Sequence, residues 1–456
     1  MEFFRFTPSN VRLRLLAVCL ASTVFIQSVP AQKQATRREH WVATWATSEP
    51  LGLVSTLPNG RGGALPVPAV AQPNAPPAVT VPAPPLGGRG RGPRIHIPPT
   101  LNDQTVRMII HVGIGGRRIR IEFSNAMMAT PVAIGAAHIA VRDQAAAIVP
   151  GTDRALTFNG KAGCTLGPGM LLFSDPVDLD VAPLSDLSVS LYLPKDTGPP
   201  TNHSLGMHTA YISQGDTTGQ TAMPEPTSTG AYFWLSAVDV LAPVNAFAIV
   251  ALGDSITDGQ GTTVDANLNW TAMLNKRLAA SKASAHISVL NQGVAGNQVL
   301  RTLSGVSALA RFDRDVLSRQ GVKWLIVFEG INDISLHGQT DSADPLTSDD
   351  MIAGYLQLIE RAHAFGIRVV GATIGPQEGT RLGTPNADLI RNAINQWVRT
   401  GRAFDAVVDL DAAVRDPAHP GRLRAEFDSG DHIHINDLGN QAMAEAFNPV
   451  IFKIAK

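Results

Sequence analysis

Ala-Ile-Val-Ala-Leu-Gly-Asp-Ser-Ile-Thr, at residues 248–257, is an apolar run that stops at a glycine and delivers Ser255 to a turn. A short run without polar alternation is typical of a strand covered on both faces, as in a parallel sheet. A hydroxyl placed where such a strand ends projects from the carboxyl edge of the sheet, which is where open α/β sheets bind ligands. The position therefore suits a serine nucleophile.

Four further apolar runs follow at 287–290, 324–328, 367–374 and 406–410, and amphipathic helical segments lie between them. One expected helix begins after Thr347 and carries an apolar stripe, and another spans 387–400 with Gly401 placed to end it. The stripe consists of Ile352, Tyr355, Leu356, Ile359 and Ala362. Strands alternating with helices predict a three-layer α/β/α domain with about five parallel strands, and we place it at 244–456.

The preceding region has a different rhythm. Residues 118–124 and 187–191 alternate polar and apolar side chains, which predicts half-buried antiparallel strands. Gly115-Gly116 is a candidate hairpin turn. We therefore predict an all-β, sandwich-like accessory domain within 32–240, interrupted by a Pro- and Gly-rich loop at 58–99.

The amino-terminal end has the pattern of an export signal. Three arginines precede an apolar stretch at 15–26, and Val29-Pro30-Ala31 offers small residues for cleavage. Residues 1–31 are predicted to be a signal peptide, so the mature chain would begin near Gln32 in the periplasm or outside the cell. No later segment is apolar enough over the ~20 residues of a spanning helix, so no stable membrane insertion is expected after cleavage.

The charge balance limits the classes of partner. Charged residues make up 16% of the 456 residues and the formal net charge is -1, which gives no general attraction to nucleic acid or an anionic membrane. Arg89, Arg91 and Arg94 alternate with glycines, a pattern that a solvated loop explains better than a nucleic-acid contact. We expect a small-molecule or oligosaccharide substrate and no nucleic acid. No pattern in the sequence indicates the oligomeric state.

Four blocks of the second domain resemble the GDSL/SGNH hydrolase family and occur in its order. They are Gly253-Asp254-Ser255-Ile256, followed by Thr257-Asp258-Gly259; Asn291-Gln292-Gly293-Val294-Ala295-Gly296-Asn297; Gly330-Ile331-Asn332-Asp333; and Asp431-His432-Ile433-His434. The longer phrases resemble a subgroup of exported esterases with a β-rich region ahead of the catalytic domain. The resemblance implies a carboxylic-ester hydrolase that uses no metal and no organic cofactor.

The residue types support the same chemistry. A serine hydroxyl needs a base within hydrogen-bond reach, and an imidazole needs a carboxylate to fix its tautomer. Ser255, His434 and Asp431 are the candidates for these roles, although His434 could be structural and Asp431 could be a helix cap. We predict a two-step acyl transfer through an acyl-enzyme.

The resemblance assigns three donors to the oxyanion hole, namely the amides of Ser255 and Gly296 and the side chain of Asn332. Gly296 could instead be a turn glycine, and Asn332 could cap a loop. Asp254 and Asp333 are expected to accept hydrogen bonds that stabilise these loops, and His432 is expected to be structural or to face the substrate. Family members often carry proline after the catalytic histidine, whereas this chain has Ile435.

Other functions stay open. His432, His434, Asp409, Asp411 and Asp431 could bind a divalent metal and hydrolyse phosphoesters, or the protein could bind glycans without catalysis. An arylesterase or lipase-like acylhydrolase is a milder alternative, although the G-x-S-x-G elbow is absent at Ser255. The subgroup resemblance favours short acyl groups on sugars, such as acetyl on xylan.

Overall fold

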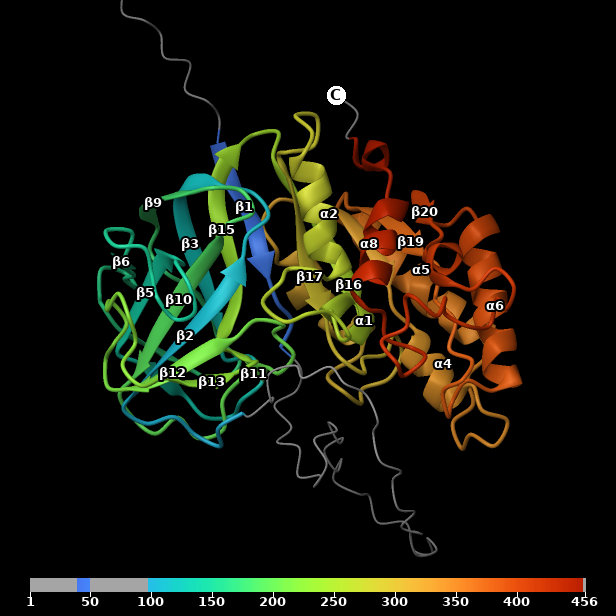
Figure 1. The fold of residues 1–456 in the computed structure, drawn as a ribbon, viewed down its shortest axis with the longest axis horizontal. Coiled ribbons are helices and arrows are strands. Elements are labelled where there is room, and N and C mark those ends of the chain that lie inside the picture. Colours follow the sequence, from blue (N-terminus) through green and yellow to red (C-terminus); the bar gives the residue numbers. More distant parts are fainter. Residues whose placement is uncertain (1–38, 50–96, 454–456) are drawn as a thin grey trace, which may run out of the picture. The chain divides into compact units, whose positions relative to one another are not determined.

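A parallel sheet of five strands forms the centre of the C-terminal half, as predicted (Figure 1). The computed structural model describes residues 39–49 and 97–453, so the predicted signal peptide and nearly all of the Pro- and Gly-rich loop lie outside the described residues. The strands, in spatial order, are β17 (Ile287–Gly293), β16 (Phe247–Gly253), β18 (Val322–Phe328), β19 (Arg368–Ala372) and β20 (Ala406–Val408).

Helices cover both faces of this sheet, which explains why its strands lack polar alternation: all seven residues of β16 are buried. One group of mutually contacting helices contains α2 (Trp270–Ala279), α7 (Leu410–Val414) and α8 (Asp437–Ala446). The other contains α3 (Ala308–Phe312), α4 (Ile331–His337), α5 (Ser348–Ala364) and α6 (Pro385–Thr400). The remaining turns are α1 (Ser255–Asp258), the π-helix η1 (Asp313–Leu317) and the 3₁₀-helix η2 (Pro449–Phe452).

The two predicted long helices are present, with one correction. A capping box between Thr347 and Asp350 begins α5, and Gly401 ends α6. The predicted apolar stripe of α5 is partly wrong, because Leu356 is 44% exposed. The buried face runs instead through Met351, Gly354, Tyr355, Leu358, Ile359 and Ala362.

Two antiparallel sheets make up the region before residue 244, which we call the β-rich region (Figure 1). The first contains β1 (Glu39–Ala46), β15 (Leu235–Pro243), β3 (Gly116–Ser124), β8 (Leu171–Phe173) and β9 (Val177–Val181). The second contains β13 (Thr227–Thr229), β12 (Ala210–Gln214), β2 (Gln104–His111), β10 (Asp186–Leu193), β5 (Ala136–Val141) and β6 (Arg154–Ala155). Two short pairs, β11 (Asn202–His203) with β14 (Tyr232–Phe233) and β4 (Val132–Ile134) with β7 (Cys164–Leu166), complete it.

Two expectations for the β-rich region need correction. Gly115-Gly116 is not a hairpin turn, since β2 and β3 belong to different sheets. A glycine is needed at 115 because a Cβ there would lie 2.2 Å from the carbonyl oxygen of Val181. Nor is β10 half-buried, because Ser188 and Ser190 are 1% and 2% exposed. Alternation here predicts the strand correctly but not its surroundings.

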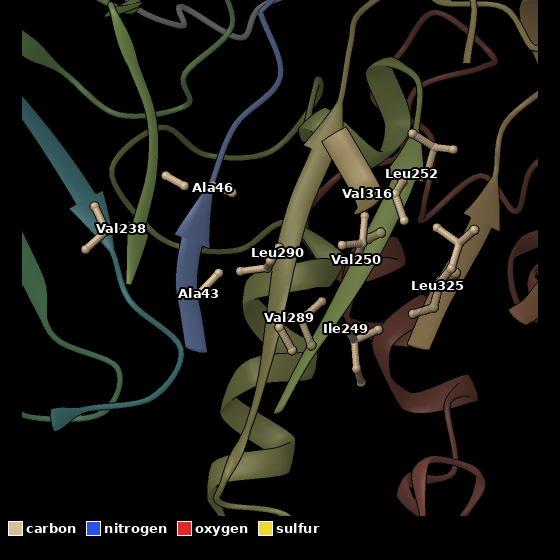
Figure 2. Close-up of a cluster of buried hydrophobic side chains, with 14 of the residues drawn as sticks. Ala43, Ala46, Val238, Ile249, Val250, Leu252, Val289, Leu290, Val316 and Leu325 are labelled. Carbon is tan, nitrogen blue, oxygen red and sulfur yellow. The ribbon is translucent and has the colours of Figure 1, made fainter. Parts of the chain in front are cut away.

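The β-rich region packs directly on the parallel sheet. Strand β1 lies beside β17, and Figure 2 shows Ala43 of β1 facing Leu290 of β17. Ser288 in β17 donates a 2.5 Å hydrogen bond to the carbonyl of Ala43, whose own amide donates to the carbonyl of Gln320 at 3.0 Å. The described residues, 39–49 and 97–453, accordingly belong to one compact unit. Within the described part of the chain, no helix has the length and apolarity needed to cross a membrane.

Candidate active site

Ser255 begins α1, directly after β16 ends. The turn is tight, since a Cβ on Gly253 would lie 2.1 Å from the Thr257 hydroxyl, so only glycine fits. Asp254 caps the turn by accepting a 2.9 Å hydrogen bond from the Ile256 amide, as predicted. The serine hydroxyl is thereby held at the carboxyl edge of the sheet, at the end of a strand that lies between β17 and β18.

The loop before α8 brings His434 to this hydroxyl. The Oγ of Ser255 lies 2.8 Å from Nε2 of His434, across 179 residues of sequence. On the other side of the ring, Nδ1 of His434 lies 2.6 Å from Oδ2 of Asp431. The remaining Asp431 oxygen accepts the amides of Ile433 and His434 at 3.2 and 2.9 Å. Three residues from two distant blocks therefore form one continuous hydrogen-bonded chain.

These contacts determine which ring nitrogen carries the proton. An ionised carboxylate only accepts hydrogen bonds, so Nδ1 of His434 donates to Asp431 and Nε2 is free to accept the Ser255 proton. Burial would raise the pKa of Asp431, but the hydrogen bond and charge of His434, with the two amides, hold it well below its usual value. The carboxylate thus stays ionised throughout the physiological pH range.

The second and third blocks are joined by Asn332. Its Nδ2 donates a 2.9 Å hydrogen bond to the carbonyl of Asn297, the residue after Gly296. An amide group carries two donor hydrogens, so this bond leaves a second one for another acceptor. Gly296 has a φ of 76°, and a Cβ on it would lie 2.6 Å from the hydroxyl of Ser304. Gly296 and Asn332, two of the three predicted oxyanion-hole positions, therefore lie on segments that this hydrogen bond links.

Asp333 fixes the segment that follows the second block. Its two carboxylate oxygens accept the amides of Val299 and Leu300 at 2.8 and 3.1 Å, as predicted for a loop-stabilising acceptor. Burial raises its pKa to about 6, although these amides oppose the shift.

Burial likewise raises the pKa of the Asp254 carboxyl, from 3.8 to about 7. A raised pKa in the folded state means that folding favours the protonated form, so this contribution to stability is full below pH 3.8 and declines until about pH 7. Asp254→Asn keeps the acceptor for the Ile256 amide but cannot ionise. We therefore expect its stability relative to wild type to increase as the pH rises over this range, by on the order of a few kcal/mol. Urea unfolding of both proteins at the two ends of the range measures this change. A difference in the free energy of unfolding that is the same at both pH values would contradict the prediction.

The residues of the metal-site alternative do not form one cluster, because several of them pair with other side chains. His432, exposed and with a φ of 68°, pairs through Nδ1 with Asp428 at 2.7 Å. Asp409 and Asp411 both receive hydrogen bonds from Arg399, at 2.8–2.9 and 2.7 Å. Among residues 39–49 and 97–453, no group of three or more His, Cys, Asp or Glu side chains could hold a metal ion.

Ile435, where family members often have proline, is 1% exposed and packs in the core. The next residue, Asn436, caps α8 by accepting from the amide of Gly439. The helix therefore begins normally without the proline.

Arg311, a fully buried arginine beneath the site, is not among the residues predicted from the sequence. It donates to the carbonyls of Gly253 and Gln292 at 2.9 and 2.7 Å, and to the side chain of Asn297 at 2.9 Å. Its guanidinium also pairs with Asp315 and Glu329 at 3.1 and 3.3 Å. Arg311 thus holds the ends of β16 and β17 together. The only sequence signal is the i, i+4 spacing to Asp315, which most surface helices also show.

The β-rich region also makes contacts here that were not predicted from the sequence. Ser48 donates to Asp315 at 2.9 Å and accepts from Arg311 at 2.9 Å. His203, in β11, lies 2.9 Å from Asp258, which is the last residue of α1. Neither residue lies near a motif in the sequence, so no local pattern could have found it.

Comparison with known proteins identifies the second half of the chain. Residues 251–442 match the GDSL-like Lipase/Acylhydrolase family. No curated protein matches the chain. Similar solved structures include a catalytic mutant of an acetylxylan esterase from Geobacillus stearothermophilus, with 20% identity over 45% of this chain and 94% of that chain, and a TM-score of 0.35. A member of the lipolytic protein G-D-S-L family from Veillonella parvula has 17% identity over 44% and 96%, with a TM-score of 0.32. A GDSL-like lipase from Bacteroides thetaiotaomicron has 17% identity over 45% and 87%, with a TM-score of 0.33.

Proposed function

We propose that Ser255 is the nucleophile of this protein. The premise is that residues 251–442 form a GDSL-like lipase/acylhydrolase domain and that the chain is a carboxylic-ester hydrolase. The observation that carries the proposal is the chain of contacts from Ser255 through His434 to Asp431, at 2.8 and 2.6 Å. This arrangement can activate a hydroxyl that is otherwise a weak nucleophile at neutral pH.

The reaction would proceed in two steps. The Ser255 oxygen bonds to the ester carbonyl carbon while His434 takes the serine proton at Nε2. The tetrahedral intermediate then loses the alcohol, which receives that proton from His434, and an acyl-enzyme remains. Water next attacks the acyl carbon with His434 as base, and the carboxylic acid leaves as Ser255 regains its proton.

Negative charge develops on the carbonyl oxygen in each step, and donors fixed in advance would stabilise it. We assign these donors to the Ser255 amide, the Gly296 amide and the second N–H of Asn332. The hydrogen bond from Asn332 to the Asn297 carbonyl supports this assignment, because it fixes the amide plane before the substrate arrives. A donor that needs no reorganisation is the most effective kind.

Asn332→Ala is expected to lower kcat by about 10²- to 10³-fold, because one oxyanion donor is lost. Steady-state hydrolysis of p-nitrophenyl acetate measures the effect, and circular dichroism checks that the variant is folded. Asn386→Ala is the matched control, since Asn386 lies on α6 and its side-chain amide also donates to a carbonyl, that of Gly338, at 2.8 Å. A kcat for Asn332→Ala equal to that of the control would remove Asn332 from the hole.

We propose short-chain acyl esters of carbohydrate as the substrate class, with acetylated xylan as one example. The support is the resemblance of the motifs to a subgroup of exported esterases, together with a net charge of -1 that gives no general preference for charged polymers. The export signal at residues 1–31 belongs to the same proposal. An exported protein whose amino terminus, by mass spectrometry, does not begin near Gln32 would contradict that part.

The substrate class is tested by two assays on the mature chain, with Ser255→Ala as the blank. The first compares nitrophenyl esters of increasing acyl length, and the second follows deacetylation of acetylated xylo-oligosaccharides by mass spectrometry. We expect the highest kcat/KM for acetyl and release of acetate from the oligosaccharide. Preference for long acyl chains without deacetylation would favour the lipase-like alternative and leave the ester hydrolase intact.

A further inference from the structure

His203 is a buried residue of the β-rich region that contacts the catalytic half of the molecule. Its side chain is 4% exposed, and both ring nitrogens face acceptors. Nδ1 lies 2.6 Å from the carbonyl of Ser48, and Nε2 lies 2.9 Å from Oδ1 of Asp258. Nε2 also lies 3.2 Å from the carbonyl of Leu205. Carbonyl oxygens only accept hydrogen bonds, so both nitrogens of the ring are donors and the pair is an imidazolium with a carboxylate.

The charges at this pair support that state. Burial alone would lower the pKa of His203, but the charge and hydrogen bond of Asp258, with the carbonyls of Ser48 and Leu205, raise it above its usual value. Burial also raises the pKa of Asp258, against the charge and hydrogen bond of His203, so the assignment of an ion pair rests on the acceptors around the ring rather than on this shift. Two opposite charges buried at contact distance with further hydrogen bonds hold a defined geometry, because moving either one leaves the other unpaired in the interior.

Asp258 also contacts the second block. Its other oxygen, Oδ2, accepts the amide of Ala295 at 3.2 Å. Ala295 immediately precedes Gly296, and the loop lies against α1 so closely that a Cβ on Gly293 would be 2.3 Å from the Asp258 amide. We call residues 293–297 the oxyanion loop. One side chain therefore connects His203 both to the turn that carries Ser255 and to this loop.

We propose that His203 is a positioning residue of the β-rich region, which acts through Asp258 to hold the oxyanion loop at the distance from Ser255 that the transition state requires. The proposal rests on the proposed function, because it takes Gly296 as an oxyanion donor. It makes the β-rich region part of the catalytic apparatus.

His203→Phe tests the proposal on the mature chain. Phenylalanine keeps a ring against Tyr232, whose ring centre lies 6.2 Å from that of His203, but it removes both hydrogen bonds. A misplacement of about 1 Å can cost 10²-fold in rate, so we expect kcat for p-nitrophenyl acetate to fall about 10- to 100-fold. KM should change little, because the lost contact acts in the transition state only.

Inhibition by a trifluoromethyl ketone separates positioning from general destabilisation. Its adduct with the serine places an oxyanion in the hole, so its Ki should rise in proportion to the fall in kcat/KM. Asp258→Asn removes the same ion pair, and His203 can then lose a proton to become neutral, so this variant carries the test if His203→Phe does not fold. The double variant should be no slower than the slower single variant, because both substitutions break one link.

His138→Phe is the matched control. His138 also pairs with an aspartate, Asp153, at 2.9 Å in the β-rich region, and is 20% exposed. Its kcat and Ki should equal those of wild type. Wild-type kcat and Ki in folded His203→Phe and Asp258→Asn would overturn the proposal. Failure of the proposed function is distinguishable, since wild type would then be inactive on esters or Ser255→Ala would remain active.

Discussion

Replacing Ser255 by alanine is expected to lower kcat for ester hydrolysis by about 10⁴- to 10⁶-fold, because the nucleophile of the acyl transfer is removed while the oxyanion donors remain. The loss should appear in kcat, since the ester binds through groups that the substitution leaves in place. Hydrolysis of p-nitrophenyl acetate by wild type and variant measures it. The melting temperature should be almost unchanged, because only the hydrogen bond to His434 is lost.

Ser284→Ala provides the control for this prediction. Ser284 is also buried in the catalytic half, lies outside the four blocks, and donates to the carbonyl of Leu278 at 2.8 Å. It should keep wild-type activity. Should Ser255→Ala retain more than about a tenth of the wild-type kcat, an acyl-enzyme on Ser255 is ruled out.

Replacing Arg311 by methionine is expected to lower the free energy of unfolding by about 3–5 kcal/mol, the usual loss when one partner of a buried ion pair is removed. The side chains of Arg311 and Asp315 are both 1% exposed. Without Arg311, the Asp315 carboxylate would keep only its ion pair with Arg314. The carbonyls of Gly253 and Gln292 would lose a donor as well. Urea unfolding followed by tryptophan fluorescence measures the loss.

An exposed arginine shows what burial contributes to this effect. Arg422 pairs with Glu378 at 2.6 Å, but the two side chains are 58% and 47% exposed. Arg422→Met should cost about 0–1 kcal/mol, as surface pairs do. If Arg311→Met lowered the free energy of unfolding no more than Arg422→Met, Arg311 would not hold the ends of β16 and β17 together.

The parallel sheet could be predicted because its signal is local. Each strand is an apolar run between turn residues, and all five lie where the pattern places them. The exposed face of α5 was harder, since apolar residues such as Ile352 and Leu356 flank the buried face and a single helix does not show which neighbour it meets. The hairpin at Gly115 failed because the glycine serves a close approach to Val181, not a turn.

The contacts of the candidate site could be anticipated only where a motif marks them. Ser255, His434 and Asp431 stand in blocks with recognisable spacing, and the structure brings all three together. Arg311 and His203 carry no such mark. Their partners are carbonyls and carboxylates from other segments, so their importance arises from tertiary contacts that a single sequence does not display.

The identity of the nucleophile is tested most directly by covalent labelling with a fluorophosphonate. The mature protein is incubated with the probe, digested, and analysed by mass spectrometry for the modified peptide. We expect one adduct per chain, on Ser255, and none in Ser255→Ala. An adduct on another residue, or labelling of Ser255→Ala at the wild-type rate, would contradict it.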